Sequence, residues 1–401
     1  MSYHPIFDTI AVAFLAPIVI GFTSPSSPLR RISLFVLAYL TFHCLSSCPD
    51  YIKRSIWAAA LGGYTLFSFL HYLDVAVLSG WSFDARGPTN GLINRNGRVS
   101  NSKKYPYSSG SHRLNITSRL KFGFSIFFSW RFVNTPYQVR AVPQLDKTLY
   151  SSTRFLFYTG WTILACYLVL DEMNSLRDKN ITTKFWLLDK INPFSRAGEV
   201  SFRERYFATI GLGVSLISFQ RGVYAVASFV CVAMGLSSPW DWPPFNGPIL
   251  TSFSLRYTWS IFWPQTNSHW LHALANYVVY DIFRLRRSGR LVRYMRICLM
   301  FAISGAIHVA VDFSSGIPVL KSGALRFFLI QPLGIFIEDI ISVAPGIDLL
   351  PHIVQRFLSF IWLSLWMTWT APGYVYPIIY KSASGGGLVP FSIIGYLKQN
   401  Y

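Results

Sequence analysis

A histidine stands alone in an apolar stretch near the end of the chain. Residues Ile303–Phe313 read ISGAIHVAVDF, so His308 is flanked by isoleucine and valine. An ionisable side chain in such a segment is costly to bury and usually faces a cavity or a partner. An imidazole there can act as a general base near neutral pH. A packed histidine that hydrogen-bonds to a helix neighbour fits the same context equally well.

A carboxylate lies one helical turn after this histidine. Asp312 is four residues from His308, and residues four apart share one face of a helix. Asp312 can therefore orient the imidazole and favour its protonated form. It can equally lie at the edge of a membrane, because Ser314 and Ser315 follow directly.

A second group of polar side chains lies upstream, in residues 240–296. The segment begins WDWPPFNG, and its prolines prevent a regular helix. Irregular backbone at membrane depth is tolerated where it lines a cavity or packs within protein, so we predict a re-entrant segment. The alternative is an aromatic belt at the membrane interface with ordinary polar neighbours. The candidates here are the aromatic Trp259, Phe262, Trp263 and Trp270, and the polar Gln265, Asn267, His269, His272 and Asn276.

These residue types suit acyl transfer from a thioester to an alcohol. A histidine can take the hydroxyl proton as the oxygen attacks. An asparagine or a second histidine can hold the hydroxyl or the developing oxyanion. Burial excludes water, which would otherwise hydrolyse the thioester. The sequence contains no glycine-rich phosphate loop and no metal-type histidine cluster, so no metal is predicted.

A run of arginines follows the polar group. Guanidinium groups bind phosphates well, so Arg284, Arg287 and Arg290 are candidates for the phosphates of coenzyme A. The same run can instead anchor the topology, because cytosolic loops of membrane proteins are rich in lysine and arginine. The whole run is Arg284, Arg286, Arg287, Arg290, Arg293 and Arg296.

The composition indicates the elements that must position these residues. Of the 401 residues, 52% are hydrophobic and only 13% are charged, whereas soluble domains carry about 25% charged residues. The net charge of +19 would suggest nucleic acid in a soluble protein. Here the basic residues separate apolar segments, which favours topology and anionic lipid as the explanation. We therefore predict an all-α, multi-pass integral membrane protein with no nucleic-acid partner.

The apolar segments predict about 8–9 transmembrane helices. Segment 206–236 is interrupted by Gln220 and Arg221, and forms either one tilted span or two short ones. With one span there and a lumenal N-terminus, the main basic loops all face the cytosol. These loops contain Arg30 and Arg31, residues 82–150 and residues 284–296. The predicted spans are about 5–22, 32–47, 56–79, 153–171, 206–236, 297–313, 324–344 and 353–371, with 261–283 as a further membrane-embedded candidate.

Residues 1–401 are predicted to form a single membrane-embedded domain. It has N-terminal spans (1–81), a basic cytosolic loop (82–150) and core spans (151–401). Within the loop, polar residues fall at helical spacing and leave phenylalanine and isoleucine on the other face. This pattern predicts an interfacial amphipathic helix lying on the cytosolic leaflet. The polar positions are Ser118, Lys121, Ser125 and Ser129.

Three blocks of sequence carry a family resemblance. They are SIFFSWRFVNTPYQVRAVP (125–143), SSPWDWPPFNG (237–247) and SLRYTWSIFWPQTNSHWLHALANYVV (254–279), the last followed by SGAIH (304–308). Their order and spacing resemble the wax-synthase-like branch of the membrane-bound O-acyltransferases. Within that branch, the chain from about residue 118 onward is most similar to fungal members that acetylate terpenoids and meroterpenoids.

The resemblance implies an acetyl-CoA-dependent O-acetyltransferase of the endoplasmic reticulum in secondary metabolite biosynthesis. Acetyl-CoA would be a co-substrate and a lipophilic alcohol the acceptor. The family's catalytic histidine corresponds to His308. The family's Trp–His pair is interrupted here, because Leu271 stands between Trp270 and His272. His272 is the first choice for the second active-site residue. His269 and Asn276 come behind it, while Trp263, Gln265 and Asp312 are expected to contact substrate.

Three other functions remain open at this point. A long-chain wax ester synthase would use the same chemistry with a longer acyl tunnel. A membrane terpenoid cyclase would need a protonated acid such as Asp312 or Glu338. A transporter or structural protein would use His308 only as a hydrogen bond between helices, although no inverted repeat of broken helices supports a transporter.

Overall fold

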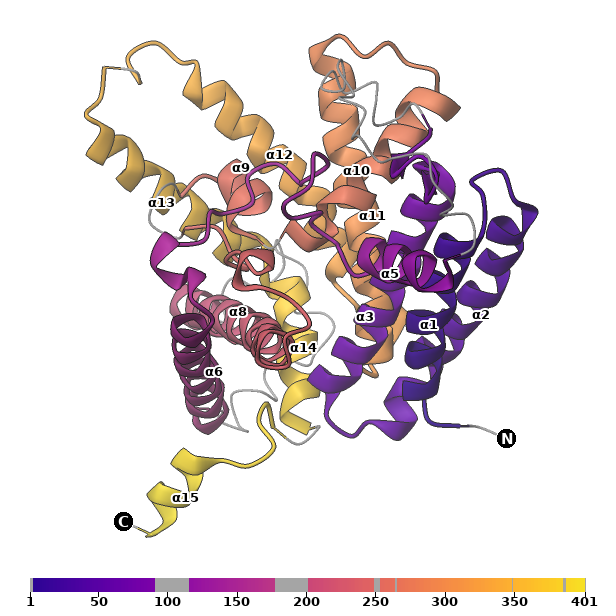
Figure 1. Cartoon of the computed structure of the whole chain (residues 1–401). Helices are drawn as coiled ribbons and strands as arrows, with labels where there is room; N and C mark the ends of the chain where they lie inside the picture. The colour runs from indigo at the N-terminus through magenta and orange to yellow at the C-terminus, as the bar shows by residue number, and fades with distance from the viewer. Residues whose placement is uncertain are drawn as a thin grey trace.

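The computed structural model describes residues 3–90, 115–176, 201–248, 253–263, 265–347, 349–384 and 387–400. These residues form helices joined by loops (Figure 1), which confirms the predicted all-α class. Strand structure in the described ranges is limited to two-residue strands, β1 (Trp81–Ser82) and β2 (Gly87–Pro88), which pair antiparallel with Trp81 opposite Pro88.

The helical elements follow the predicted segments closely. Three of them, η1, η6 and η8, are π-helical, and the short η3, η5, η7 and η9 are 3₁₀ turns. In chain order they are α1 (Ile6–Phe22), α2 (Pro28–Tyr51), α3 (Ser55–Tyr72), η1 (Leu73–Leu78), α5 (Ile116–Phe127), η3 (Lys147–Tyr150), α6 (Ser152–Ser175), α8 (Phe202–Ala233), η5 (Pro239–Asp241), α9 (Leu255–Tyr257), η6 (Thr258–Phe262), η7 (Gln265–Asn267), α10 (Ser268–Asn276), η8 (Tyr277–Ile282), α11 (Arg290–Ser314), η9 (Val319–Lys321), α12 (Ala324–Ser342), α13 (His352–Thr370), α14 (Pro372–Ser384) and α15 (Ile393–Asn400).

Five of the described helices are long and apolar enough to cross a membrane. They are α2, α3 continued by η1, α6, α8 and α11, and α1 is a shorter apolar helix. The segment around Gln220 is one continuous helix of 32 residues, so the alternative of two short spans is wrong. The helix starts at a capping box in which the Ser201 hydroxyl accepts from the Glu204 amide and the Glu204 carboxylate accepts from the Ser201 amide.

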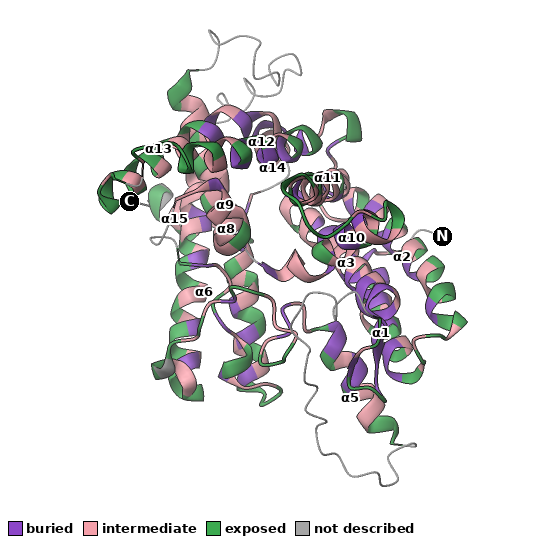
Figure 2. Ribbon diagram, turned by 90° about the horizontal axis from the view of Figure 1, so that it is seen from above, coloured by how far each residue is buried: buried purple, intermediate pink, exposed green. Residues whose placement is uncertain are grey.

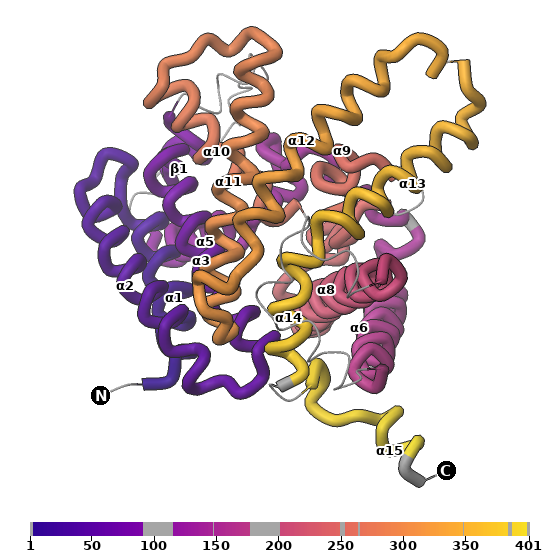
Figure 3. The backbone as a smooth tube through the Cα atoms, turned by 180° about the vertical axis from the view of Figure 1, so that it is seen from behind, coloured from indigo at the N-terminus to yellow at the C-terminus, as the bar shows by residue number. Residues whose placement is uncertain are grey.

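The helices form two groups that meet along α11. One group contains α1, α2, α3 and α5, and the other contains the paired α6 and α8 with α12, α13 and α14 (Figures 1 and 3). Buried residues gather where the elements face one another, and exposed residues cover the outer faces of α6 and α13 (Figure 2). An apolar core fills each group. The first includes Val12, Ile20, Tyr72, Phe127 and Phe132, and the second includes Phe327, Phe328, Val375 and Tyr376.

Helix α5 corrects the interfacial-helix prediction in one respect. The helix forms at the predicted place, with Lys121 and Ser125 exposed. Its apolar face does not simply meet lipid, because Phe122, Ile126 and Phe127 are buried in the first core. The contact with α1 is so close that a Cβ on Gly123 would lie 2.0 Å from the Pro17 carbonyl oxygen. Because Gly123 has no side chain, α5 can approach α1 this closely and packs against it.

Arg30 also departs from its predicted place in a cytosolic basic loop. It is 1% exposed, and its guanidinium donates five hydrogen bonds. The acceptors are the carbonyl oxygens of Ile20, Thr23, Ala76 and Trp81 and the hydroxyl of Thr23, at 2.8–3.2 Å. The side chain therefore joins the ends of α1 and η1 to β1, and its charge stabilises the fold.

Replacing Arg30 by lysine is expected to destabilise the protein. Lysine keeps the charge but has three donors on one nitrogen, so several buried carbonyls lose their partners. We expect a loss on the order of 2–4 kcal/mol, measured as thermal unfolding of the purified protein in detergent. Arg31→Lys is the matched control, because Arg31 is exposed next to it. Equal unfolding temperatures for the two variants would contradict this role.

Candidate active site

The three sequence blocks interlock around one buried guanidinium. Arg131, from the first block, is 5% exposed. It donates to the carbonyl oxygens of Pro243 (2.9 Å) and Pro244 (2.8 Å) in the second block, and to the hydroxyl of Tyr224 (2.6 Å). Tyr224 in turn donates to the Pro243 carbonyl at 2.8 Å. The guanidinium thus holds the Trp–Pro–Pro turn against α8.

The third block is tied to both of the others. The Gly247 amide donates to the Phe262 carbonyl at 3.1 Å, and a Cβ on Gly247 would lie 2.3 Å from the Ile261 carbonyl oxygen. The Gln265 side-chain amide donates to the carbonyls of Ile261 (2.7 Å) and Ala141 (3.2 Å). The family pattern in the sequence therefore corresponds to a single set of packed turns.

Two acidic residues of α12 hold the start of this third block. The Glu338 carboxylate accepts from the backbone amides of Leu255 (2.6 Å) and Arg256 (3.1 Å), and so caps α9. Asp339 accepts from the Arg256 guanidinium. Carboxylates are stabilised at helix N-termini, where amide hydrogens lack partners. Glu338 is therefore engaged with the backbone and is not a free acid.

Helix α10, which carries His269, His272 and Asn276, is surrounded by π-helical turns. Segment η6 precedes it, η8 continues it, and η1 packs against it. Such turns are rare and often occur at functional sites. The helix also packs against α11, the helix of His308. The predicted re-entrant segment is therefore a chain of short helical pieces, and its depth in the bilayer stays a prediction.

Three histidines at these helices share one hydrogen-bonding pattern. In His308, Nδ1 lies 2.7 Å from the Ser304 carbonyl oxygen, and in His272 it lies 2.8 Å from the Ser268 carbonyl oxygen. A carbonyl only accepts, so Nδ1 carries the hydrogen and Nε2 keeps its lone pair in the neutral ring. The Nδ1 of His269 is bonded to the Asp74 carboxylate. In each ring one nitrogen fixes the orientation and Nε2 is left for other contacts.

Aromatic side chains from α12 and α14 enclose His308. Its ring lies 4.4 Å from that of Phe328 and 6.1 Å from that of Tyr374. Phe328 also contacts Trp259, which lies 6.0 Å from Trp263, so the predicted aromatic group does reach His308. The sequence analysis missed Phe328 and Tyr374. Among 33 phenylalanines and 22 tyrosines, nothing in their sequence context marks these two.

His272 is the most open of the three rings. The side chain is exposed, yet protein surrounds it on most sides. This desolvation lowers the pKa of His272 below its ordinary value, and the positive charges of Arg296 and Arg140 act in the same direction. The ring is therefore neutral at neutral pH, as a base or a lone-pair acceptor must be.

The other residues predicted to contact substrate differ in whether their polar atoms have hydrogen-bond partners in the described residues. Asp312 is 4% exposed and accepts from the Ser322 hydroxyl at 2.5 Å, while His308 is oriented by Ser304. Trp270 and Asn276 are buried, and their Nε1 and Oδ1 atoms have no partner in the described residues. Gln265, 1% exposed, uses its nitrogen in the interlock and leaves Oε1 unpartnered. Asp312 therefore joins α11 to the loop before α12.

The arginine run lies at the turn between η8 and α11, at the opposite end of the molecule from the N-terminus (Figure 1). Arg284, Arg286 and Arg290 are exposed, and Arg287 lies over the Tyr280 ring at 4.7 Å. The exposed apolar residues Ile282 and Phe283 stand beside them. The turn therefore offers several guanidinium groups to an anionic ligand or lipid.

Comparisons with known proteins place this arrangement in context. Residues 242–330 match the model of the membrane bound O-acyl transferase family. Acetyltransferase aurG from Calcarisporium arbuscula is 32% identical, over 90% of this chain and 90% of its own length. Acetyltransferase fsoF from Humicola fuscoatra is 29% identical over 93% and 96%, and acetyltransferase nanB from Aspergillus nanangensis 26% over 94% and 90%. No solved structure matches the chain.

Substituting Gly247 by alanine tests the interlock. The added methyl would overlap the Ile261 carbonyl, so the turn must shift, and we expect a loss of about 1–3 kcal/mol in unfolding free energy. Gly213→Ala in α8 is the control, because no atom lies within 4 Å of its added methyl. Thermal unfolding in detergent measures both. A Gly247→Ala protein as stable as the control would show that the close contact is unimportant.

Proposed function

The chain belongs to the membrane-bound O-acyltransferase family, and we propose that it transfers an acetyl group from acetyl-CoA to a hydroxyl of a lipophilic small molecule. The relatives named above support acetyl as the acyl group, because all three are called acetyltransferases. The acceptor we propose is a terpenoid or meroterpenoid alcohol. The protein would act as a single domain in the endoplasmic reticulum membrane.

His308 is the proposed general base. Its Nε2 takes the proton of the acceptor hydroxyl as the oxygen attacks the thioester carbonyl carbon. The carbon–sulfur bond then breaks, and the coenzyme A sulfur leaves as a thiol after receiving that proton. The observation that carries this role is the bond from Nδ1 of His308 to the Ser304 carbonyl, which presents the lone pair of Nε2. The rings of Phe328 and Tyr374 beside it favour an apolar acceptor and exclude water.

His272 is the proposed second active-site residue. It lies on α10, which packs against the helix of His308. As a neutral ring whose Nδ1 donates to Ser268, it can accept a hydrogen bond at Nε2 from the acceptor hydroxyl. Arg296 and Arg140 lie close enough to influence its charge. We infer that the donor reaches His272 from the arginine-rich turn, and that the acceptor enters from the membrane.

The hydrogen bonds of the two candidate acids make a terpenoid cyclase the weaker candidate. That reaction needs a free protonated acid, whereas Asp312 is bonded to Ser322 and Glu338 caps α9. Wax ester synthesis uses the same residues as acetyl transfer. Only the length of the acyl group that the enzyme accepts separates it from acetyl transfer.

Replacing His308 by alanine is expected to lower acetyl transfer by about 10²–10⁴-fold, because the proton acceptor is lost. The measurement uses microsomes that contain equal amounts of each protein, labelled acetyl-CoA and a panel of terpenoid alcohols. His352→Ala is the control, since His352 is exposed at the start of α13. Transfer by His308→Ala at the wild-type rate would disprove the general-base role. Transfer from labelled palmitoyl-CoA to a long-chain alcohol, with none from acetyl-CoA, would favour wax ester synthesis.

The arginine turn is expected to govern the affinity for acetyl-CoA. The double variant Arg284→Ala and Arg290→Ala removes two exposed positive charges, so we expect KM for acetyl-CoA to rise about tenfold while kcat changes little. Arg356→Ala, an exposed arginine of α13, is the matched control. If KM for acetyl-CoA does not change, these arginines serve topology or lipid binding instead.

A further inference from the structure

A buried carboxylate lies behind one of the three histidines. Asp74, in the π-helical turn η1, is 0% exposed. One of its oxygens accepts from the Ser79 hydroxyl at 2.6 Å, and the other is bonded to Nδ1 of His269. His308 and His272 are bonded to neutral carbonyl groups instead. His269 is therefore the only one of the three whose orienting partner carries a charge.

The free side of His269 is available to a ligand. Its side chain is 12% exposed, and its ring lies 4.5 Å from that of Phe132. No hydrogen bond to Nε2 exists within the described residues, and this nitrogen is absent from the buried atoms that lack partners there. Nε2 therefore keeps accessible surface. A buried carboxylate without a cation is costly, and in an ion pair of Asp74 with the imidazolium form of His269 both ring nitrogens carry hydrogens, so that Nε2 can donate.

The position of His269 is on the donor side of the proposed site. It precedes His272 by one turn of α10, and both His269 and Arg296 influence the charge of His272. During acyl transfer, negative charge develops on the oxygen of the donor's carbonyl, and a fixed donor at that oxygen is worth a large rate factor.

We propose that Asp74 is a positioning residue that orients His269, and that His269 donates a hydrogen bond from Nε2 to the carbonyl oxygen of the acyl donor. This inference rests on the proposed acetyl transfer and gives His308 and His269 separate roles in it. His308 takes the proton from the acceptor, whereas the Asp74–His269 pair holds the donor and stabilises its developing oxyanion. The inference adds no proton transfer to the reaction, because His269 keeps its hydrogen throughout.

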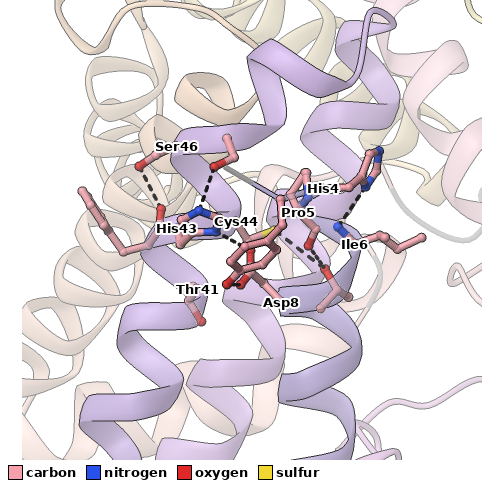
Figure 4. A network of polar contacts seen from close by, with 12 residues as sticks. His4, Pro5, Ile6, Asp8, Thr41, His43, Cys44 and Ser46 are labelled. Atoms are coloured by element: carbon pink, nitrogen blue, oxygen red, sulfur yellow. Dashed lines mark hydrogen bonds and ion pairs between the residues drawn. The ribbon is translucent and has the colours of Figure 1, made fainter. Parts of the chain in front are cut away.

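The chain contains a second buried His–Asp pair that serves as a matched control. Asp8 is 0% exposed and lies 2.7 Å from Nδ1 of His43, and the Tyr3 hydroxyl donates to its other oxygen (Figure 4). The Nε2 of His43 lies 3.4 Å from the Ser47 hydroxyl, so both ring nitrogens are engaged. This pair connects α1 to α2 and offers no free nitrogen. Breaking it tests what the loss of a buried pair does to stability alone.

The experiment is a double-mutant cycle in the purified full-length protein. Asp74→Asn, His269→Gln and the double variant are assayed with acetyl-CoA and the terpenoid alcohol that the wild type acetylates fastest. We expect kcat/KM for acetyl-CoA to fall about 10²–10³-fold in His269→Gln, with KM for the alcohol little changed. Asp74 acts through His269, so the double variant should lose no more than His269→Gln alone. Asp8→Asn should lower the unfolding temperature and leave kcat of the folded protein unchanged.

Several outcomes overturn the inference. Wild-type kinetics in Asp74→Asn, or losses that multiply in the double variant, would show that Asp74 does not act through His269. Activity that falls only in proportion to folded protein, as expected for Asp8→Asn, would reduce the pair to a structural contact. If Asp74→Asn does not accumulate, Ser79→Ala removes the other bond to the carboxylate, and an unchanged kcat/KM for acetyl-CoA there also overturns the inference. A wild type without acetyl transfer disproves the proposed function itself, which separates the two failures.

Discussion

The bonds of the Arg131 guanidinium organise the rest of the site. The turn at Pro243 and Pro244 cannot donate through those two residues, and the Pro243 carbonyl oxygen is buried, where it needs a donor. One guanidinium supplies this donor and reaches the Pro244 carbonyl and Tyr224 as well. This turn also places Gly247 against Ile261, and so fixes the position of η6, the segment that precedes α10. The helix that carries His269 and His272 therefore depends on a charge that is bonded to two backbone carbonyls and a tyrosine hydroxyl.

The same rule explains other buried charges in this molecule. Arg30 supplies donors to carbonyl groups at the ends of α1 and η1, and Glu338 supplies acceptors to the amides that begin α9. In a membrane protein neither water nor lipid can satisfy such groups deep in the structure, so ionised side chains do it. Charged residues that seem suited to chemistry in the sequence can thus be part of the scaffold. Asp312 likewise has a structural partner in Ser322, and its contact with substrate stays a prediction.

The histidines are used differently from these scaffold charges. Within the part of the chain that the structure describes, each of His269, His272 and His308 uses one ring nitrogen for orientation and has no bond to the other, whereas His43 uses both. Their partners also differ, since one is a carboxylate and two are carbonyls. Such a division suits a reaction in which one group must accept a proton and another must stabilise an oxyanion.

Local sequence determined the membrane class, the helix positions and the Trp–Pro–Pro turn, because hydrophobic runs and prolines act through nearest neighbours. It marked His308 as a candidate, and the family resemblance favoured that residue for catalysis. Local sequence also indicated α5 and the polar group on α10. Tertiary structure alone decided that Arg30 is buried, that Glu338 caps α9, that Phe328 and Tyr374 enclose His308, and that Asp74 lies behind His269. Some of these contacts join residues far apart in the chain: Glu338 is 83 positions from Leu255, and His269 is 195 positions from Asp74. Nothing in the local pattern encodes such pairs, because they depend on how whole helices cross and on which buried polar groups need partners.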